Sequence, residues 1–63
     1  MTELYNGWLV YSRRVGIYGE WIGEAVKDDQ QLFTGRFSGK GAKRKALAAI
    51  KAKVDTISGE RLK

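Results

Sequence analysis

The amino-acid sequence predicts an α+β fold in which a three-stranded antiparallel β-meander packs on one C-terminal α-helix. Three observations lead to this prediction. Segments with the alternating pattern of strands occupy the chain up to residue 37. The connections between them are far shorter than the dozen or more residues that parallel pairing requires. After residue 39 the apolar residues recur at intervals of three and four, which is the period of a helix.

The three strands are expected at about residues 7–14, 20–26 and 31–37. The first is dense in aromatic and branched residues and ends at a glycine-containing turn. The second ends at Asp28 and Asp29, because aspartate side chains readily bond to their own backbone in turns. Two short connections in succession favour a meander.

Alternation divides the second strand into two faces. Trp21, Gly23 and Ala25 share one face, and the small side chains there allow an alanine-rich helix to approach closely. We therefore expect the helix to cover this face, together with Phe37. The opposite face should stay uncovered and should present Ile22, Glu24, Val26 and Arg36, with Arg14 and Tyr18 at its margin.

The helix is expected at about residues 40–57, since its alanines have high helix propensity. Ser58-Gly59 provides a plausible stop, because glycine tolerates the left-handed conformation that ends many helices. The expected apolar stripe consists of Leu47, Ile50, Val54 and Ile57, with Ala46 beside it.

Composition restricts the function to non-enzymatic classes. The 63 residues are enough for a single domain, 1–63, and they include no cysteine and no histidine. Disulfides, thiolate metal sites and histidine catalysis are therefore excluded. Glu20 and Glu24 lie about 13 Å apart along a strand, too far for a two-carboxylate mechanism that needs about 5–9.5 Å. We expect no enzyme activity, no metal and no cofactor.

Location follows from what the sequence lacks. The stretch Met1-Thr2-Glu3-Leu4 has neither the basic start nor the apolar segment of a secretion signal. No apolar run approaches the roughly 20 residues of a membrane span. We expect a cytoplasmic protein without a membrane partner, since the apolar stripe of the helix is needed for the core.

Positive charge is concentrated in the last third of the chain. Residues 1–39 contain four bases and five acids, whereas residues 40–63 contain eight bases and two acids. Lys40, Lys43, Arg44 and Lys45 fall at the expected helix start, where the helix dipole already places positive charge. Basic side chains at this position destabilise the isolated helix and favour the binding of an anion such as phosphate. The pI near 9.8 likewise indicates a polyanionic partner.

Two short motifs, YGEWIGEA at residues 18–25 and LFTGRF at residues 32–37, precede an alanine-rich helix. In this order they resemble the DNA-binding domain of plant ethylene-response factors and, more loosely, the arm-binding domain of phage and transposon integrases. In the plant family the sheet lies in the major groove. The resemblance covers about residues 8–54, and Val26 stands where that family has a further base.

The resemblance implies a DNA-facing set and a core set. The implied core is Trp21, Gly23, Ala25 and Phe37. The implied DNA-facing residues are Arg14, Tyr18, Glu20, Glu24, Phe33 and Arg36.

These observations predict a small nucleic-acid-binding domain with duplex DNA as the partner. Its expected contacts are Arg13, Arg14, Tyr18, Arg36, Lys40, Lys43, Arg44 and Lys45. The alternative is a protein-interaction module that uses the apolar residues Ile22 and Val26 of the uncovered face to form a homodimer or to hold a protein partner. Antitoxins with a half ribonuclease-H-like sheet and one helix share the strand order, and they belong to this alternative.

Overall fold

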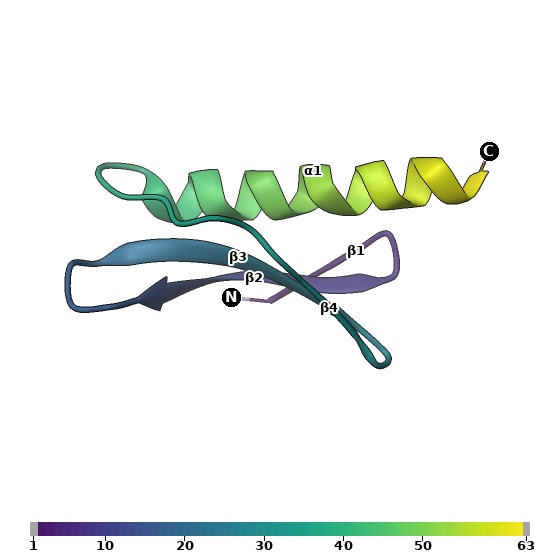
Figure 1. Cartoon of the computed structure of the whole chain (residues 1–63), viewed down its shortest axis with the longest axis horizontal. Coiled ribbons are helices and arrows are strands. Elements are labelled where there is room, and N and C mark those ends of the chain that lie inside the picture. The colour runs from purple at the N-terminus through teal and green to yellow at the C-terminus, as the bar shows by residue number, and fades with distance from the viewer. Residues whose placement is uncertain (1, 63) are drawn as a thin grey trace.

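The computed structural model describes residues 2–62, with the side chains of residues 2–57. The molecule has two layers, an antiparallel sheet and one long helix that lies across one of its faces (Figure 1). The α+β class is confirmed, but the predicted number of three strands is wrong, because the sheet has four. In chain order the elements are β1 (Glu3–Tyr5), β2 (Trp8–Val15), β3 (Glu20–Lys27), β4 (Gln30–Phe33) and α1 (Ala42–Leu62).

The additional strand is β1, which pairs with β2 through a tight hairpin. Asn6 and Gly7 form its two-residue turn with φ angles of 49° and 85°. Turns with two positive φ angles match the twist of paired strands and favour the sequence Asn-Gly. Tyr5 consequently pairs with Trp8, and β1 extends the sheet beyond the predicted meander.

The predicted third strand, 31–37, is shorter than expected. β4 ends at Phe33, and the hydroxyl of Thr34 then accepts a hydrogen bond from the amide of Gly23 at 2.8 Å. Because a side chain takes over the role of the backbone there, the chain leaves the ladder. It returns for one bridge, in which Phe37 and Trp21 exchange two backbone hydrogen bonds of 2.8 Å.

α1 is longer than predicted, since it starts at Ala42 and continues through Ser58-Gly59 to Leu62. Its buried stripe is also rotated relative to the predicted one, and Leu47 and Ile57 are only partly buried. The buried positions are spaced four apart: Ala42, Ala46, Ile50 and Val54.

The helix approaches β3 most closely at Gly23. A Cβ atom added to Gly23 would lie 2.3 Å from the backbone oxygen of Ala46 and 2.8 Å from the Cβ atom of Ile50. The small residues of the helix therefore lie where the backbones meet. The close approach expected from Gly23 and the alanines is confirmed.

The centre of the core lies between α1 and the middle strands. Trp8 is 2% exposed and Val10 is fully buried, and both project from β2 toward Ile50 and Val54. Ala25 of β3 completes the cluster. The core position of Ala25 is the predicted one, whereas the burial of Trp8 and Val10 was not predicted.

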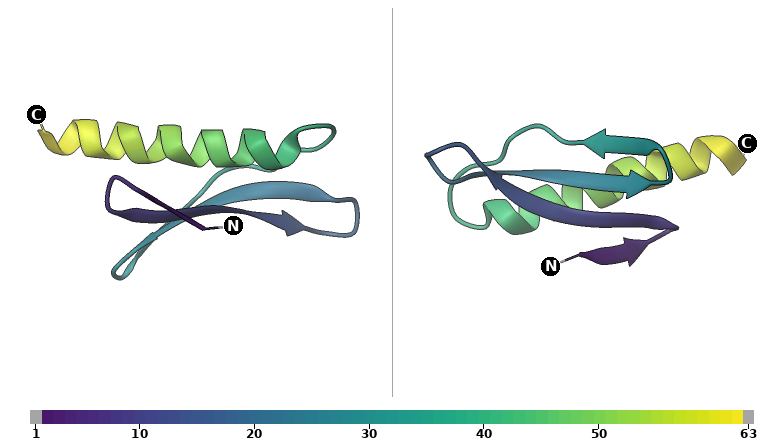
Figure 2. Two further views of the ribbon diagram at one scale, coloured as in Figure 1. Left: turned by 180° about the vertical axis from the view of Figure 1, so that it is seen from behind. Right: turned by 90° about the horizontal axis from the view of Figure 1, so that it is seen from below.

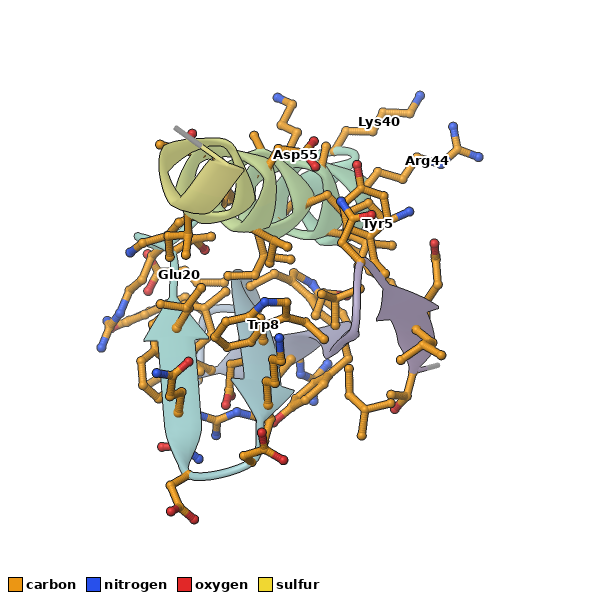
Figure 3. The ribbon with its side chains drawn as sticks, turned by 90° about the vertical axis from the view of Figure 1, so that its right-hand side faces the viewer. Tyr5, Trp8, Glu20, Lys40, Arg44 and Asp55 are labelled. Carbon is orange, nitrogen blue, oxygen red and sulfur yellow. The ribbon has the colours of Figure 1, made fainter. Side chains whose placement is uncertain are left out.

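Polar contacts attach the outer strands to α1. The hydroxyl of Tyr5 donates to Asp55 at 2.8 Å, and the side-chain amide of Asn6 donates to the same carboxylate at 2.9 Å (Figure 3). On the opposite edge, Lys53 donates to the backbone oxygen of Phe33 at 2.6 Å. Both edges of the sheet are thus tied to the helix.

Candidate nucleic-acid interface

Two glycines shape the start of α1. Gly39 and Gly41 have φ angles of 85° and 78°, which other residues adopt only with strain. The amide of Ala42 donates to the oxygen of Gly39 at 3.2 Å, and the amide of Lys45 donates to the oxygen of Gly41 at 3.0 Å. Gly41 is therefore the N-cap residue, and it has no side chain that could accept hydrogen bonds from the first turn.

The first turn of α1 is consequently uncapped and positive. The hydrogen bonds of the described residues give the amides of Lys43 and Arg44 no acceptor, and the turn contains no acidic residue. Lys40, Arg44 and Lys45 are exposed, and none of them has an ion-pair partner within the described part of the chain. Figure 3 shows Lys40 and Arg44 extending away from the sheet. Free amides and unpaired bases together suit an anionic ligand.

Lys43 connects this turn to the sheet. Its Nζ atom lies 5.5 Å from the centre of the Trp21 ring, a distance typical of a cation–π contact. Arg14 is the β2 partner of Trp21, so the two residues lie on the same face of the sheet. The prediction that Arg14 borders the uncovered face is therefore wrong, because its register places it on the helix-covered face, beside the start of α1.

The turn between β2 and β3 lies at the same end of the molecule as the start of α1 (Figures 1 and 2). It carries Ile17 and Tyr18, which are 89% and 85% exposed. Exposed aromatic rings can stack on the nucleobases of single-stranded nucleic acid.

Charge is segregated along the long axis of the molecule, which extends 39 Å. We call the end with the start of α1 and the β2–β3 turn the basic end. It contains one acid, Glu20, and six bases: Arg14, Arg36, Lys40, Lys43, Arg44 and Lys45. The opposite half, without residues 58–63, contains three bases and four acids: Lys27, Lys51, Lys53, Glu3, Asp28, Asp29 and Asp55.

The uncovered face of the sheet, which we call the open face, contains paired charges instead. Arg13 forms an ion pair with Glu24, whose carboxylate also accepts a hydrogen bond of 3.0 Å from Tyr11. Glu24 is only 6% exposed. Arg36 lies 3.4 Å from Glu20. Seven of the eight predicted contact residues thus lie at the basic end, but one of them, Arg36, is ion-paired on the open face, as Arg13 is farther along that face.

The two hydrogen-bonded tyrosines predict how stability depends on pH. Burial, followed by the hydrogen bond to Glu24, raises the pKa of Tyr11, and the hydrogen bond to Asp55 is the main cause of the raised pKa of Tyr5. As the pH rises, the two tyrosine hydroxyls therefore lose their protons at a lower pH in the unfolded chain than in the folded one. Their contribution to the free energy of unfolding is complete below about pH 10 and declines as the pH rises further.

Urea unfolding between about pH 9 and about pH 11 measures this decline. We expect a shallower decline in the double variant Tyr5→Phe, Tyr11→Phe than in the wild type. Tyr18→Phe is the matched control, since this exposed ring makes none of the side-chain hydrogen bonds found among the described residues. Equal slopes in all three proteins would contradict the assignment.

In the part of the chain that the structure describes, no helix combines the length and the apolar character needed to cross a membrane. The same residues contain no cluster of three or more side chains suited to hold a metal ion. Searches of protein families, curated proteins and solved structures return no match to this chain.

Sequence reasoning located the bases of the basic end but missed how they are presented. The stacking of Lys43 on Trp21 and the uncapped first turn emerge only in the structure. The uncapped turn did have a signal in the sequence, because Gly41 occupies the position where serine, threonine or aspartate usually caps a helix.

Proposed function

We propose that this chain is a nucleic-acid-binding domain that contacts the phosphate backbone of duplex DNA with its basic end. The observation that carries the proposal is the segregation of charge. Six bases and one acid lie at the end that holds an uncapped helix start, while four of the six acids among residues 2–57 lie in the opposite half. Such an arrangement raises the local potential and orients a polyanion toward one end.

This geometry favours contacts to the phosphates of the nucleic acid over contacts to its nucleobases. Lysine side chains and free helix amides fix the position of a backbone without reading its sequence. Base reading by the sheet, which the resemblance implies, stays a prediction. It requires Arg13 and Glu24 to exchange their mutual ion pair for contacts with bases. We take duplex DNA as the partner because the resemblance implies it.

The test is fluorescence anisotropy with a labelled random duplex of about 20 base pairs, titrated at several salt concentrations from about 50 to 300 mM. We expect the triple variant Lys40→Gln, Arg44→Gln, Lys45→Gln to bind more weakly on every sequence. The slope of log K against log salt is negative, and it should become less steep by about 2.7, since each of three lost phosphate contacts contributes about −0.9. Circular dichroism verifies that the variant is folded.

The matched control is the triple variant Lys27→Gln, Lys51→Gln, Lys53→Gln, which removes the same amount of charge from the opposite half. Its salt slope should stay that of the wild type. If the two variants lost the same amount of affinity for DNA, only net charge would matter, and the basic end would not be the binding site. No detectable binding of the wild type at about 50 mM salt would overturn the proposal. Stronger competition by a duplex RNA of the same sequence would reassign the partner.

A further inference from the structure

The loop between β2 and β3 presents two large hydrophobic side chains to solvent at the basic end. Ile17 and Tyr18 are the most exposed large hydrophobic residues in the described part of the chain. They are the central residues of a four-residue loop that begins at Gly16 and ends at Gly19. Small and polar residues, with proline, dominate turns of this kind. The two side chains are therefore available for a contact outside the domain.

The backbone of the loop holds these two residues without strain. Gly16 and Gly19 have φ angles of 72° and 73°, which glycine adopts at little cost. Neither Ile17 nor Tyr18 has a positive φ angle. β2 and β3 remain paired up to Val15 and Glu20, directly before and after the loop. The hairpin thus supports the exposed pair from a regular part of the sheet.

Positive charge lies around the loop. Arg14 lies beside it on the helix-covered face, and the start of α1 lies at the same end of the molecule (Figures 1 and 2). The nearest acid in sequence is Glu20, and Arg36 lies 3.4 Å from its carboxylate. A polyanion that is drawn to the basic end therefore comes close to the hydrophobic pair.

Hydrophobic side chains interact with nucleobases in two ways. An aromatic ring stacks on an unstacked nucleobase and strengthens binding by about five- to a hundredfold. An aliphatic side chain enters between neighbouring nucleobases as a wedge. In a regular duplex both contacts require that stacked base pairs first be separated, and this cost offsets the gain. The cost is smallest at a nucleobase that is already unpaired.

We propose that the β2–β3 loop contacts an unpaired nucleobase, so that the basic end prefers duplex DNA with a bulged base over a regular duplex. Tyr18 stacks on the unpaired nucleobase, and Ile17 fills the gap beside it. This inference rests on the proposed function, because the phosphate contacts of the basic end hold the duplex against the loop. The preference is for structure and not for sequence, since every nucleobase has a face that can stack.

Fluorescence anisotropy with the labelled random duplex, with and without one extra unpaired nucleotide at its centre, tests the preference. The wild type should bind the bulged duplex about tenfold more tightly. The double variant Ile17→Ser, Tyr18→Ser should bind both duplexes with the affinity of the wild type for the regular one. Tyr18→Phe should keep the preference, because the stacking ring remains. Circular dichroism verifies that each variant is folded.

The matched control is the double variant Leu4→Ser, Phe33→Ser. It also removes one aliphatic and one aromatic side chain, from positions that are 71% and 44% exposed and lie outside the basic end. This control should keep the preference of the wild type. An equal loss of preference in the two double variants would overturn the role of the loop.

The salt dependence separates this inference from the proposed function. Stacking releases no counterions, so the ratio of the two affinities should stay constant while each affinity falls with salt. A wild type that binds the regular duplex with a steep salt slope but has no preference would overturn the inference and leave the proposed function intact. Retention of the preference by Ile17→Ser, Tyr18→Ser would do the same. No binding to either duplex would overturn both.

Discussion

Replacing Gly23 with alanine is expected to cost at least about 3 kcal/mol of unfolding free energy, since even modest overpacking costs about 1–3 kcal/mol. The new methyl group would lie 2.3 Å from the backbone oxygen of Ala46. A backbone atom cannot rotate out of the way as a flexible side chain can, so α1 has to move away from the sheet. A domain of this size has only about 3–9 kcal/mol of stability. We therefore expect a largely unfolded variant.

Urea unfolding followed by circular dichroism at the helix band measures this effect. Gly35→Ala is the matched control, because no atom lies within 4 Å of the added methyl group and the φ angle of Gly35 is not positive. It should unfold at the midpoint of the wild type or slightly above it. If Gly23→Ala unfolded together with this control, the close contact between β3 and α1 would be refuted.

Replacing Trp8 with alanine is the second change with a large expected effect. Trp8 is 2% exposed and lies in the cluster with Val10 and Ile50, while Lys27 lies 5.9 Å from the centre of its ring. Removing a buried aromatic side chain costs about 3–5 kcal/mol through lost burial and the cavity that is left. This loss is comparable to the whole stability of the domain.

Trp21 remains as the only tryptophan of this variant, so its fluorescence can follow unfolding in urea. Tyr18→Ala is the control, since it removes an aromatic ring that is 85% exposed. The control should shift the midpoint little. A shift for Trp8→Ala that is no larger than that of the control would place the centre of the core elsewhere.

The packing of α1 on β3 could be predicted because it depends on local patterns. Alternation placed Trp21, Gly23 and Ala25 on one face, and the small side chains of Gly23 and Ala25 matched the alanines of the helix. β1 could not be found in this way, since three residues are too few to establish a period. Its signal was the dipeptide Asn6-Gly7, whose hairpin geometry depends on backbone angles and not on hydrophobicity.

The sequence predicts which basic residues belong to the candidate site, but not the face of the sheet on which each of them lies. The bases of the helix start are contiguous in the sequence, so their clustering was visible. The faces of Arg13 and Arg14 depend on strand parity, and a difference of one residue reverses them. Because both are arginines, hydrophobic alternation could not decide which of them projects toward the helix. The pairing of Arg14 with Trp21 decides it.

The contact between Lys53 and the backbone oxygen of Phe33 has a consequence for aggregation. Exposed edge strands are templates for the addition of further strands, which can lead to fibrils. The edge strands β1 and β4 have only three and four residues, and Lys53 donates a hydrogen bond to a backbone carbonyl of β4. Strand addition at the edges is therefore disfavoured, and we expect the protein not to form extended β-polymers at high concentration.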